Sequence, residues 1–312
     1  MLSTNIYVNT KKLNNMSVII HTPGKLILSG EHSVVHGAPA IAMSTTRGID
    51  TTISILDQPK VEIEISQYAI KSLNLDEISE LCMQIEDRFK QFKTHKIEIS
   101  KVLTEPTELI VLCYYALQKQ YSQLQKSGHK IQITSNIPIG SGMGSSAAVL
   151  LGIIKGFNQL YNLNMSDSEI CTLAIDLEHR QHGRSSGLDV GIIFREGVYF
   201  VDQNKEWHKI AALPWSIYAI PTGNPDSSTG ECVAHAKKFF DTKLIAQFGA
   251  CTMQLYDALK RHDLGSAKEA IDTNHKFLCD IGVVPESAQK LITELNKYGV
   301  AAKISGAGSI SG

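Results

Sequence analysis

The sequence predicts an α+β protein with two domains, and three observations support this. The chain has 312 residues, which is enough for two domains of ordinary size. Short strand-like runs fill much of its first part, whereas apolar residues at helical spacing dominate from residue 229 onward. A mostly polar stretch at 203–214 separates the two patterns. We expect a disordered extension at 1–16, an N-terminal domain at 17–205 and a C-terminal domain at 206–312.

The N-terminal part begins with strands and continues with helices. Apolar runs predict strands at 17–22 and 25–29, separated by Pro23-Gly24, and at 40–44, 49–56 and 61–65. Apolar spacing of three and four predicts helices at 75–92 and 107–124. The alternating run at 130–135 predicts a half-buried strand, and 149–157 predicts a buried helix. Ser166, with Glu169 three residues later, predicts a capping box for a helix that ends near residue 182.

The C-terminal part is mainly helical. We expect strands at 198–201 and 217–220, with turn-like sequence at 203–213 between them. Helical spacing of apolar residues then predicts four helices, at 230–240, 245–262, 266–278 and 286–297. A final strand is expected at 299–305.

The composition excludes several classes of protein. A net charge of −1 argues against a broad basic surface for nucleic acid or an anionic membrane. The sequence has no apolar run near the ~20 residues that cross a bilayer, and its first residues lack the apolar core of a signal peptide. Its six cysteines form no Cys-x-x-Cys pair, which favours reduced thiols. We therefore expect a cytoplasmic protein without nucleic-acid or membrane partners.

The stretch Pro138–Ala148 is the first candidate site. Gly140, Gly142 and Gly144 join a predicted strand to the start of a predicted helix. Glycines let backbone amides approach a ligand, and a helix N-terminus favours an anion such as phosphate. The alternative is a flexible turn with a serine cap. No lysine follows the last glycine, so this is not a Walker A loop and a cation must come from elsewhere.

A second candidate site is Pro23–Gly37. Lys25 begins an apolar strand and either supplies a cation or is simply solvated. His32 and His36 lack the intervening glutamate of a His-Glu-x-x-His zinc site, because Glu31 precedes the pair. We expect a turn here, with His32 as a polar contact to a hydroxylated substrate.

A third candidate site is the segment 178–189. Glu178 lies at a predicted helix end, and Asp189 follows a Ser-Ser-Gly turn and opens an apolar run that resembles a strand. Asp189 is either a turn residue or, beside a lysine, a group that orients or deprotonates a hydroxyl. His179, His182 and Asp189 would make only a weak zinc site.

The fourth candidate site is a second glycine-rich loop at 305–312, where the sequence stops. It is either a frayed tail or, as such loops usually lead into another element, part of a longer polypeptide. The chemistry that unites the four stretches is phosphoryl transfer. The glycine loop would hold phosphates, Ser146 and Glu178 offer the oxygen ligands that Mg²⁺ prefers, and Lys25 and Asp189 would flank the acceptor oxygen.

Three motifs in order, Pro23–Gly37, Pro138–Ala148 and Lys303–Gly308, resemble those of the GHMP kinases, which phosphorylate galactose, homoserine, mevalonate and phosphomevalonate. The resemblance implies an ATP-binding N-terminal domain whose fold is like that of domain 2 of ribosomal protein S5. It also implies a ferredoxin-like C-terminal domain. Residues 30–42 are most similar to the mevalonate-phosphorylating members. This similarity implies ATP- and Mg²⁺-dependent phosphorylation of the 5-hydroxyl of mevalonate in isoprenoid precursor synthesis, by a homodimer.

The resemblance also implies a role for each matching residue. Asp189 would abstract or orient the hydroxyl proton, and Lys25 would be its cationic neighbour. Ser146 and Glu178 would hold Mg²⁺. ATP would contact the residues of the glycine loop, namely Pro138, Gly140, Ser141, Gly142, Met143, Gly144, Ser145 and Ser146. The alcohol substrate would contact Glu31, His32, Ser186 and Gly187.

This chain departs from the family pattern at three places. Ser185 replaces the usual proline before Ser186-Gly187, Ser309-Ile310-Ser311 interrupts the last glycine run, and 226–231 lacks an arginine that family members carry. These departures leave phosphomevalonate kinase, another kinase of this family, and a catalytically silent relative as alternatives.

Overall fold

The computed structural model describes residues 16–66, 68–138, 141–223 and 225–310, so the predicted extension at 1–15 lies outside the described residues. The chain divides into two compact units that interleave along the sequence. The first unit contains the chain up to residue 24, 47–137 and 145–194, and the second unit contains 25–46, 138–144 and 195–312. The domain boundary that we expect near residue 205 stays a prediction.

The sheet of the first unit contains the second half of β2 (Ala40–Leu56), then β5 (Gly128–Ser135), β3 (Lys60–Ile65) and β4 (Ala69–Asn74) in that order. β5 is parallel to β3, and the other pairs are antiparallel. Ile53, Ile131 and Ile63 stand in register across three strands and are completely buried. This isoleucine row forms part of the core on which the helices pack.

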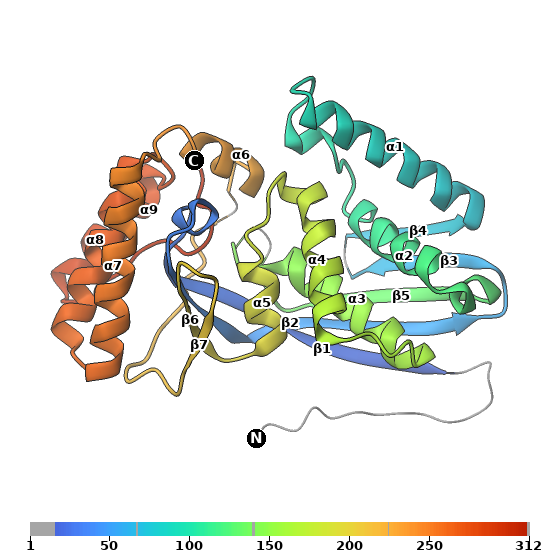
Figure 1. The fold of residues 1–312 in the computed structure, drawn as a ribbon, viewed down its shortest axis with the longest axis horizontal. Coiled ribbons are helices and arrows are strands. Elements are labelled where there is room, and N and C mark those ends of the chain that lie inside the picture. Colours follow the sequence, from blue (N-terminus) through green and yellow to red (C-terminus); the bar gives the residue numbers. More distant parts are fainter. Residues whose placement is uncertain (1–15, 67, 139–140, 224, 311–312) are drawn as a thin grey trace. The chain divides into compact units, whose positions relative to one another are not determined.

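Helices pack against one another beside this sheet, in the order α1, α2, α3, α4 (Figure 1). Their bounds are α1 Leu75–Lys93, α2 Glu108–Gln120, α3 Ser145–Tyr161 and α4 Asp167–His182, with α5 following at Leu188–Arg195. Gly152 and Gly156 give α3 a bare face toward β2. A Cβ at Gly152 would lie 2.3 Å from Thr51 Oγ1, and one at Gly156 would lie 2.6 Å from Ile53 Cδ1. The two glycines thus fix α3, and with it Ser146 in its first turn, close to the strand.

The second unit combines a short antiparallel sheet with helices. Its sheet joins the start of β2 to β6 (Val198–Val201) and β7 (Trp207–Ile210), and its short 3₁₀ helix is η2 (Ser33–His36). The α-helices are α6 Thr229–Ala236, α7 Thr242–Arg261, α8 Leu264–Asp280 and α9 Glu286–Lys297. α7 and α8 pack side by side, and buried residues of both contact Ile41 and Phe200 of the sheet in one apolar cluster. Among the described residues, no helix is both long enough and apolar enough to cross a membrane.

Several predicted elements are confirmed. The mixture of strands and helices has the α+β character that we expect. Helix α9 covers the predicted range, and Ser166 and Glu169 form the predicted capping box of α4. The residues between Gly30 and Gly37 form a turn and a single short 3₁₀ segment, so His32 and His36 do not share an α-helical face.

Other predicted elements are wrong, and pairing explains most of them. β1 (Ser17–Ser29) continues through Pro23-Gly24, because among the described strands it pairs only with β2, and an edge strand tolerates a residue without an N–H. β2 is also continuous, with its two halves paired to different strands. Two strands were not predicted: β4, with its weak alternation, and β7, within the stretch 203–213 expected to be turn-like, form as hairpin partners of β3 and β6.

Two predicted strands and one predicted helix also differ from the structure. Residues 217–220 and 299–305 are irregular, and neither segment pairs with any strand that the structure describes. Tyr218 is 84% exposed, so its segment lacks the burial that its apolar sequence suggests. The predicted helix 107–124 ends at Gln120, because Tyr121 takes an extended conformation before a 3₁₀ turn at Ser122–Lys126.

Candidate active site

Four side chains form a hydrogen-bonded cluster in the first unit. Ser146, in the first turn of α3, places its Oγ 3.3 Å from Glu178 Oε1 and 3.2 Å from His182 Nε2. Glu178 and His182 are four residues apart on α4, so both project from one face of that helix. Ser185 Oγ donates to the other carboxylate oxygen, Glu178 Oε2, over 2.7 Å. Glu178 is only 2% exposed, so this carboxylate is held among hydroxyl groups inside the protein.

The donor atoms of this cluster fit a magnesium ion. Mg²⁺ is a hard cation that prefers carboxylate and hydroxyl oxygens and usually uses only one or two protein ligands. Ser146 Oγ and Glu178 Oε1 are two such oxygens, already within hydrogen-bond distance of each other. The pair predicted from sequence is therefore brought together.

The turn at 183–188 carries Asp189 into a helix and not into the predicted strand. Ser185 N donates to His179 Nδ1 over 2.9 Å, and Leu188 N donates to Ser186 Oγ over 3.2 Å. Gly187 has a φ of +77°, a conformation that favours glycine. The chain then enters α5, with Asp189 in its first turn. A helix N-terminus stabilises a carboxylate, so the turn places Asp189 where its negative charge is favoured.

All three sequence motifs meet within the second unit. Lys25 N, on β1, donates to Met143 O of the glycine loop over 2.9 Å. Two residues along, Ile27 N donates to Ser305 Oγ over 2.9 Å. The first motif therefore binds the other two through neighbouring amides on one edge of β1. The amide of Lys25 binds the second motif, and the amide of Ile27 binds the third.

The two glycine-rich loops lie back to back. A Cβ at Gly142 would lie 2.7 Å from Ser305 O, and one at Gly306 would lie 3.0 Å from Gly142 Cα. Both residues have positive φ, +69° for Gly142 and +92° for Gly306. Neither loop has room for a side chain at this contact, which explains why glycine occupies both positions. α3 begins at Ser145, directly after Gly144.

A buried ion pair connects the first motif to the third. Lys303 Nζ contacts Glu31 Oε1 and also donates to the carbonyl oxygens of Ile27 and Ile304, at 3.2 and 2.7 Å. Burial raises the pKa of Glu31 and lowers that of Lys303, while each partner's charge opposes the shift of the other. Lys25, itself only 3% exposed, acts on both groups through its charge.

His32 is buried beside this pair. Its Nε2 lies 3.0 Å from Ala307 O, and burial lowers its pKa to about 4. The ring is therefore neutral at neutral pH. His32 also has a positive φ of +58°, which is uncommon outside glycine.

Three buried polar atoms within these motifs have no hydrogen-bond partner among the described residues, namely Ser141 Oγ, Glu31 Oε2 and His32 Nδ1. An unpaired buried polar group is costly, so native proteins usually pair it with a ligand or water. A loop hydroxyl suits a phosphate, whereas a carboxylate beside an imidazole suits a hydroxylated substrate. These atoms fit both ligand types predicted from sequence.

The predicted site residues are divided between the units. Lys25, Glu31, His32 and Ser141–Gly144 belong to the second unit, and Ser145, Ser146, Glu178, Ser186, Gly187 and Asp189 to the first. The approach of Lys25 to Asp189 therefore stays a prediction. Pro138 belongs to the second unit, and Gly140 lies outside the described residues.

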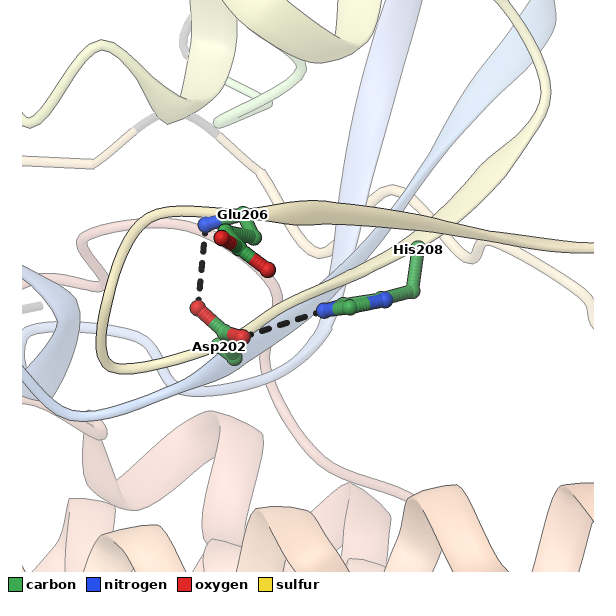
Figure 2. A group of neighbouring side chains, drawn as sticks. All are labelled: Asp202, Glu206 and His208. Atoms are coloured by element: carbon green, nitrogen blue, oxygen red, sulfur yellow. Dashed lines mark hydrogen bonds and ion pairs between the residues drawn. The ribbon is translucent and has the colours of Figure 1, made fainter.

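A further group of donor atoms lies on the β6–β7 hairpin (Figure 2). One ligand atom from each of Asp202, Glu206 and His208 lies within 4.8 Å of the others. Asp202 Oδ1 accepts from Asn204 N and Glu206 N, and Asp202 Oδ2 lies 3.0 Å from His208 Nε2. These bonds hold the pKa of Asp202 below its usual range, the contact with His208 having the largest effect. The carboxylate thus closes the hairpin turn, and we assign no site to this group.

The sequence motifs assign no individual role to His182, Ser185 or Lys303. The spacing of four between Glu178 and His182 on a predicted helix is a signal that could have placed His182 beside Glu178. The contact between Lys303 and Glu31 joins residues 272 positions apart, and no local pattern predicts it.

Comparison with known families gives a consistent result. The model of the GHMP kinases N terminal domain matches residues 108–197, and that of the GHMP kinases C terminal matches residues 255–310. Among curated relatives, the mevalonate kinase of Pyrococcus furiosus is 29% identical over 94% of this chain and 87% of its own length. The mevalonate kinase of Methanocaldococcus jannaschii is 28% identical over 93% of this chain and 89% of its own length.

Solved structures agree on the fold. A crystal structure of a mevalonate kinase superposes with a TM-score of 0.70 at 24% identity, over 93% of this chain and 88% of that one. Lactococcus lactis galactokinase, solved with galactose, gives a TM-score of 0.71 at 18% identity, over 94% of this chain and 83% of that one. Proteins with different named substrates thus share this fold, and the fold alone does not distinguish their substrates.

Proposed function

We propose that this chain, which matches the N- and C-terminal models of the GHMP kinases, transfers the γ-phosphoryl group of ATP to the 5-hydroxyl group of mevalonate. The observation that carries the proposal is the joining of the three motifs, in which Lys25 N and Ile27 N bind the two glycine-rich loops. Full-length similarity to several curated mevalonate kinases supports the choice of substrate.

The glycine loop and the start of α3 are proposed to hold the triphosphate. Backbone amides of a glycine-rich loop and a helix N-terminus bind phosphate through N–H groups and a favourable dipole. Ser141 Oγ, which has no partner among the described residues, would donate to a phosphate oxygen. Ser146 and Glu178 would hold Mg²⁺, which when bound offsets the negative charge of the phosphates.

Asp189 and Lys25 are proposed to act at the acceptor hydroxyl. A bond forms between the hydroxyl oxygen and the γ-phosphorus as the bond from that phosphorus to the bridging oxygen of ADP breaks. The hydroxyl proton passes to Asp189, or Asp189 only orients the hydroxyl and the proton leaves to solvent. Asp189 lies in the first turn of α5, where the helix dipole favours a negative charge, and Lys25 would stabilise the developing charge.

Glu31 and His32 are proposed to contact mevalonate. Glu31 Oε2 and His32 Nδ1, which have no hydrogen-bond partner among the described residues, would bind polar groups of this molecule, and Ser186 and Gly187 are proposed as further substrate contacts. A cytoplasmic location and a homodimeric state complete the proposal.

The test identifies the product by mass. Purified protein is incubated with ATP, Mg²⁺ and mevalonate, and the product is compared with authentic 5-phosphomevalonate. We expect mevalonate to gain one phosphoryl group at the 5-oxygen with the wild-type protein, and far less product in the same time with the Asp189→Asn variant. A protein that phosphorylates phosphomevalonate or a sugar but leaves mevalonate unchanged would show that the proposed substrate is wrong.

A further inference from the structure

His182 contacts the same hydroxyl group that we propose as a magnesium ligand. Ser146 Oγ lies 3.3 Å from Glu178 Oε1 and 3.2 Å from His182 Nε2, so a carboxylate oxygen and an imidazole nitrogen, which accepts when it carries no proton, both face one O–H. A serine hydroxyl has one proton to donate and two lone pairs with which to accept. It cannot donate to both neighbours at once, so the direction of its O–H depends on which acceptor is available.

A bound cation changes which acceptor is available. Mg²⁺ held by Ser146 and Glu178 occupies a lone pair of the hydroxyl and an oxygen of the carboxylate. The Ser146 proton must then point away from the cation, because an O–H directed at it would be repelled. The imidazole nitrogen of His182, in its neutral form, is the remaining acceptor within 3.2 Å among the contacts described for Ser146.

We propose that His182 is a positioning residue for the magnesium site, which accepts the Ser146 proton so that a lone pair of Ser146 Oγ faces the cation. Ser185 has the matching role at the other ligand, because its hydroxyl donates to Glu178 Oε2 over 2.7 Å and leaves Oε1 toward Ser146. Hydrogen bonds of this kind orient metal ligands, and their loss typically weakens metal affinity by about 10–100-fold.

The fold makes this assignment specific to His182. α3 and α4 pack side by side, and a spacing of four residues places His182 and Glu178 on the face of α4 that meets Ser146. His179 is one turn away, and its Nδ1 already accepts the Ser185 amide, so it serves the turn before α5. Gln181 is adjacent on α4 and half-buried, and it offers a control at the same depth.

The experiment measures nucleotide binding without catalysis. The dissociation constant of the non-hydrolysable ATP analogue AMPPNP is determined by calorimetry with Mg²⁺ and with a chelator, in the absence of any alcohol. Wild type, His182→Leu, His182→Gln and the control Gln181→Leu are compared. The ratio of the two dissociation constants reports the contribution of the metal alone.

We expect His182→Leu to lose about 10-fold or more of the Mg²⁺-dependent gain in affinity while its affinity in the chelator stays at the wild-type value. His182→Gln, whose amide oxygen can still accept the Ser146 proton, should recover most of the gain, and Gln181→Leu should keep all of it. Should His182→Leu not fold, His182→Asn, whose amide is too short to reach Ser146, takes its place with the same expected loss.

Other results would overturn the proposal. Equal losses with and without Mg²⁺ would show that His182 has only a structural role, and an unchanged ratio in His182→Leu would show that it has none at the metal. A wild-type protein that gains no affinity from Mg²⁺ would also contradict it. The inference rests on the proposed nucleotide site but not on the alcohol, so a protein that binds Mg²⁺–AMPPNP yet ignores mevalonate would refute only the proposed substrate.

Discussion

Replacing Gly142 with alanine should weaken both the protein and its nucleotide site. The residue has a φ of +69°, and an alanine in this left-handed region costs about 1–2 kcal/mol. The new Cβ would also lie 2.7 Å from Ser305 O, a backbone atom that cannot move without the loop. Such overpacking costs a further ~1–3 kcal/mol. We therefore expect Gly142→Ala to lose about 2–5 kcal/mol of unfolding free energy.

Gly299 provides a matched control for the cost of placing alanine in a left-handed backbone conformation. Its φ is +71°, nearly the same as that of Gly142, but a Cβ there would meet only the flexible Lys268 Nζ at 4.0 Å. Gly299→Ala should therefore lose only the ~1–2 kcal/mol of left-handed strain. The difference between the two variants isolates the contact between the glycine-rich loops.

Urea unfolding and ATP kinetics together measure the effect. A displaced Ser305 loop also disturbs the bond from Ile27 N to Ser305 Oγ, so the KM for ATP should rise several-fold in Gly142→Ala and stay unchanged in Gly299→Ala. Equal losses of stability and equal KM values in the two variants would refute the claim that the loops support each other.

Three more predictions concern single side chains. Asp189→Asn should lower kcat by about 10²–10⁴-fold while AMPPNP binding, measured by calorimetry, keeps its wild-type affinity; substantial remaining turnover would argue against its role. Glu31→Gln should lose about 3–5 kcal/mol in urea unfolding, because Lys303 is left buried without the carboxylate that pairs with it. The control Glu64→Gln, which removes a partly exposed ion pair, should lose much less unfolding free energy, and equal losses in the two variants would refute the role of burial. Burial lowers the pKa of His129 to about 4, so the unfolded chain takes up a proton that the folded chain refuses. Stability should fall by about 3 kcal/mol as the pH drops from about 6.5 to about 4, and His129→Asn should remove that part of the slope of unfolding free energy against pH.

Elements with local signals were predictable from the sequence. The capping box of Ser166 and Glu169 fixes the start of α4 through hydrogen bonds within four residues. The apolar spacing that predicts α9 likewise lies entirely within the helix itself. The segment after Gly187 looks like a strand because it is almost wholly apolar. It becomes α5 and is buried at most positions, and periodicity cannot distinguish a buried strand from a short buried helix.

The candidate site was partly predictable. Residue type and order point to Ser146 and Glu178, and packing of α3 against α4 brings them together. The ion pair of Glu31 and Lys303 depends on how distant segments fold onto one another, so no sequence spacing reveals it. The same holds for the close contact between Gly142 and Ser305.

A single competition reaction tests the proposed function most directly. Mevalonate, phosphomevalonate, homoserine and galactose are mixed at equal concentration with limiting Mg²⁺–ATP, and the phosphorylated products are quantified by mass spectrometry. The ratio of products reports the ratio of kcat/KM values, which is the measure of specificity. We predict that mevalonate accepts nearly all of the transferred phosphoryl group and is converted to 5-phosphomevalonate. A mixture in which another alcohol is phosphorylated in preference to mevalonate, or in which none is phosphorylated, would contradict the proposal.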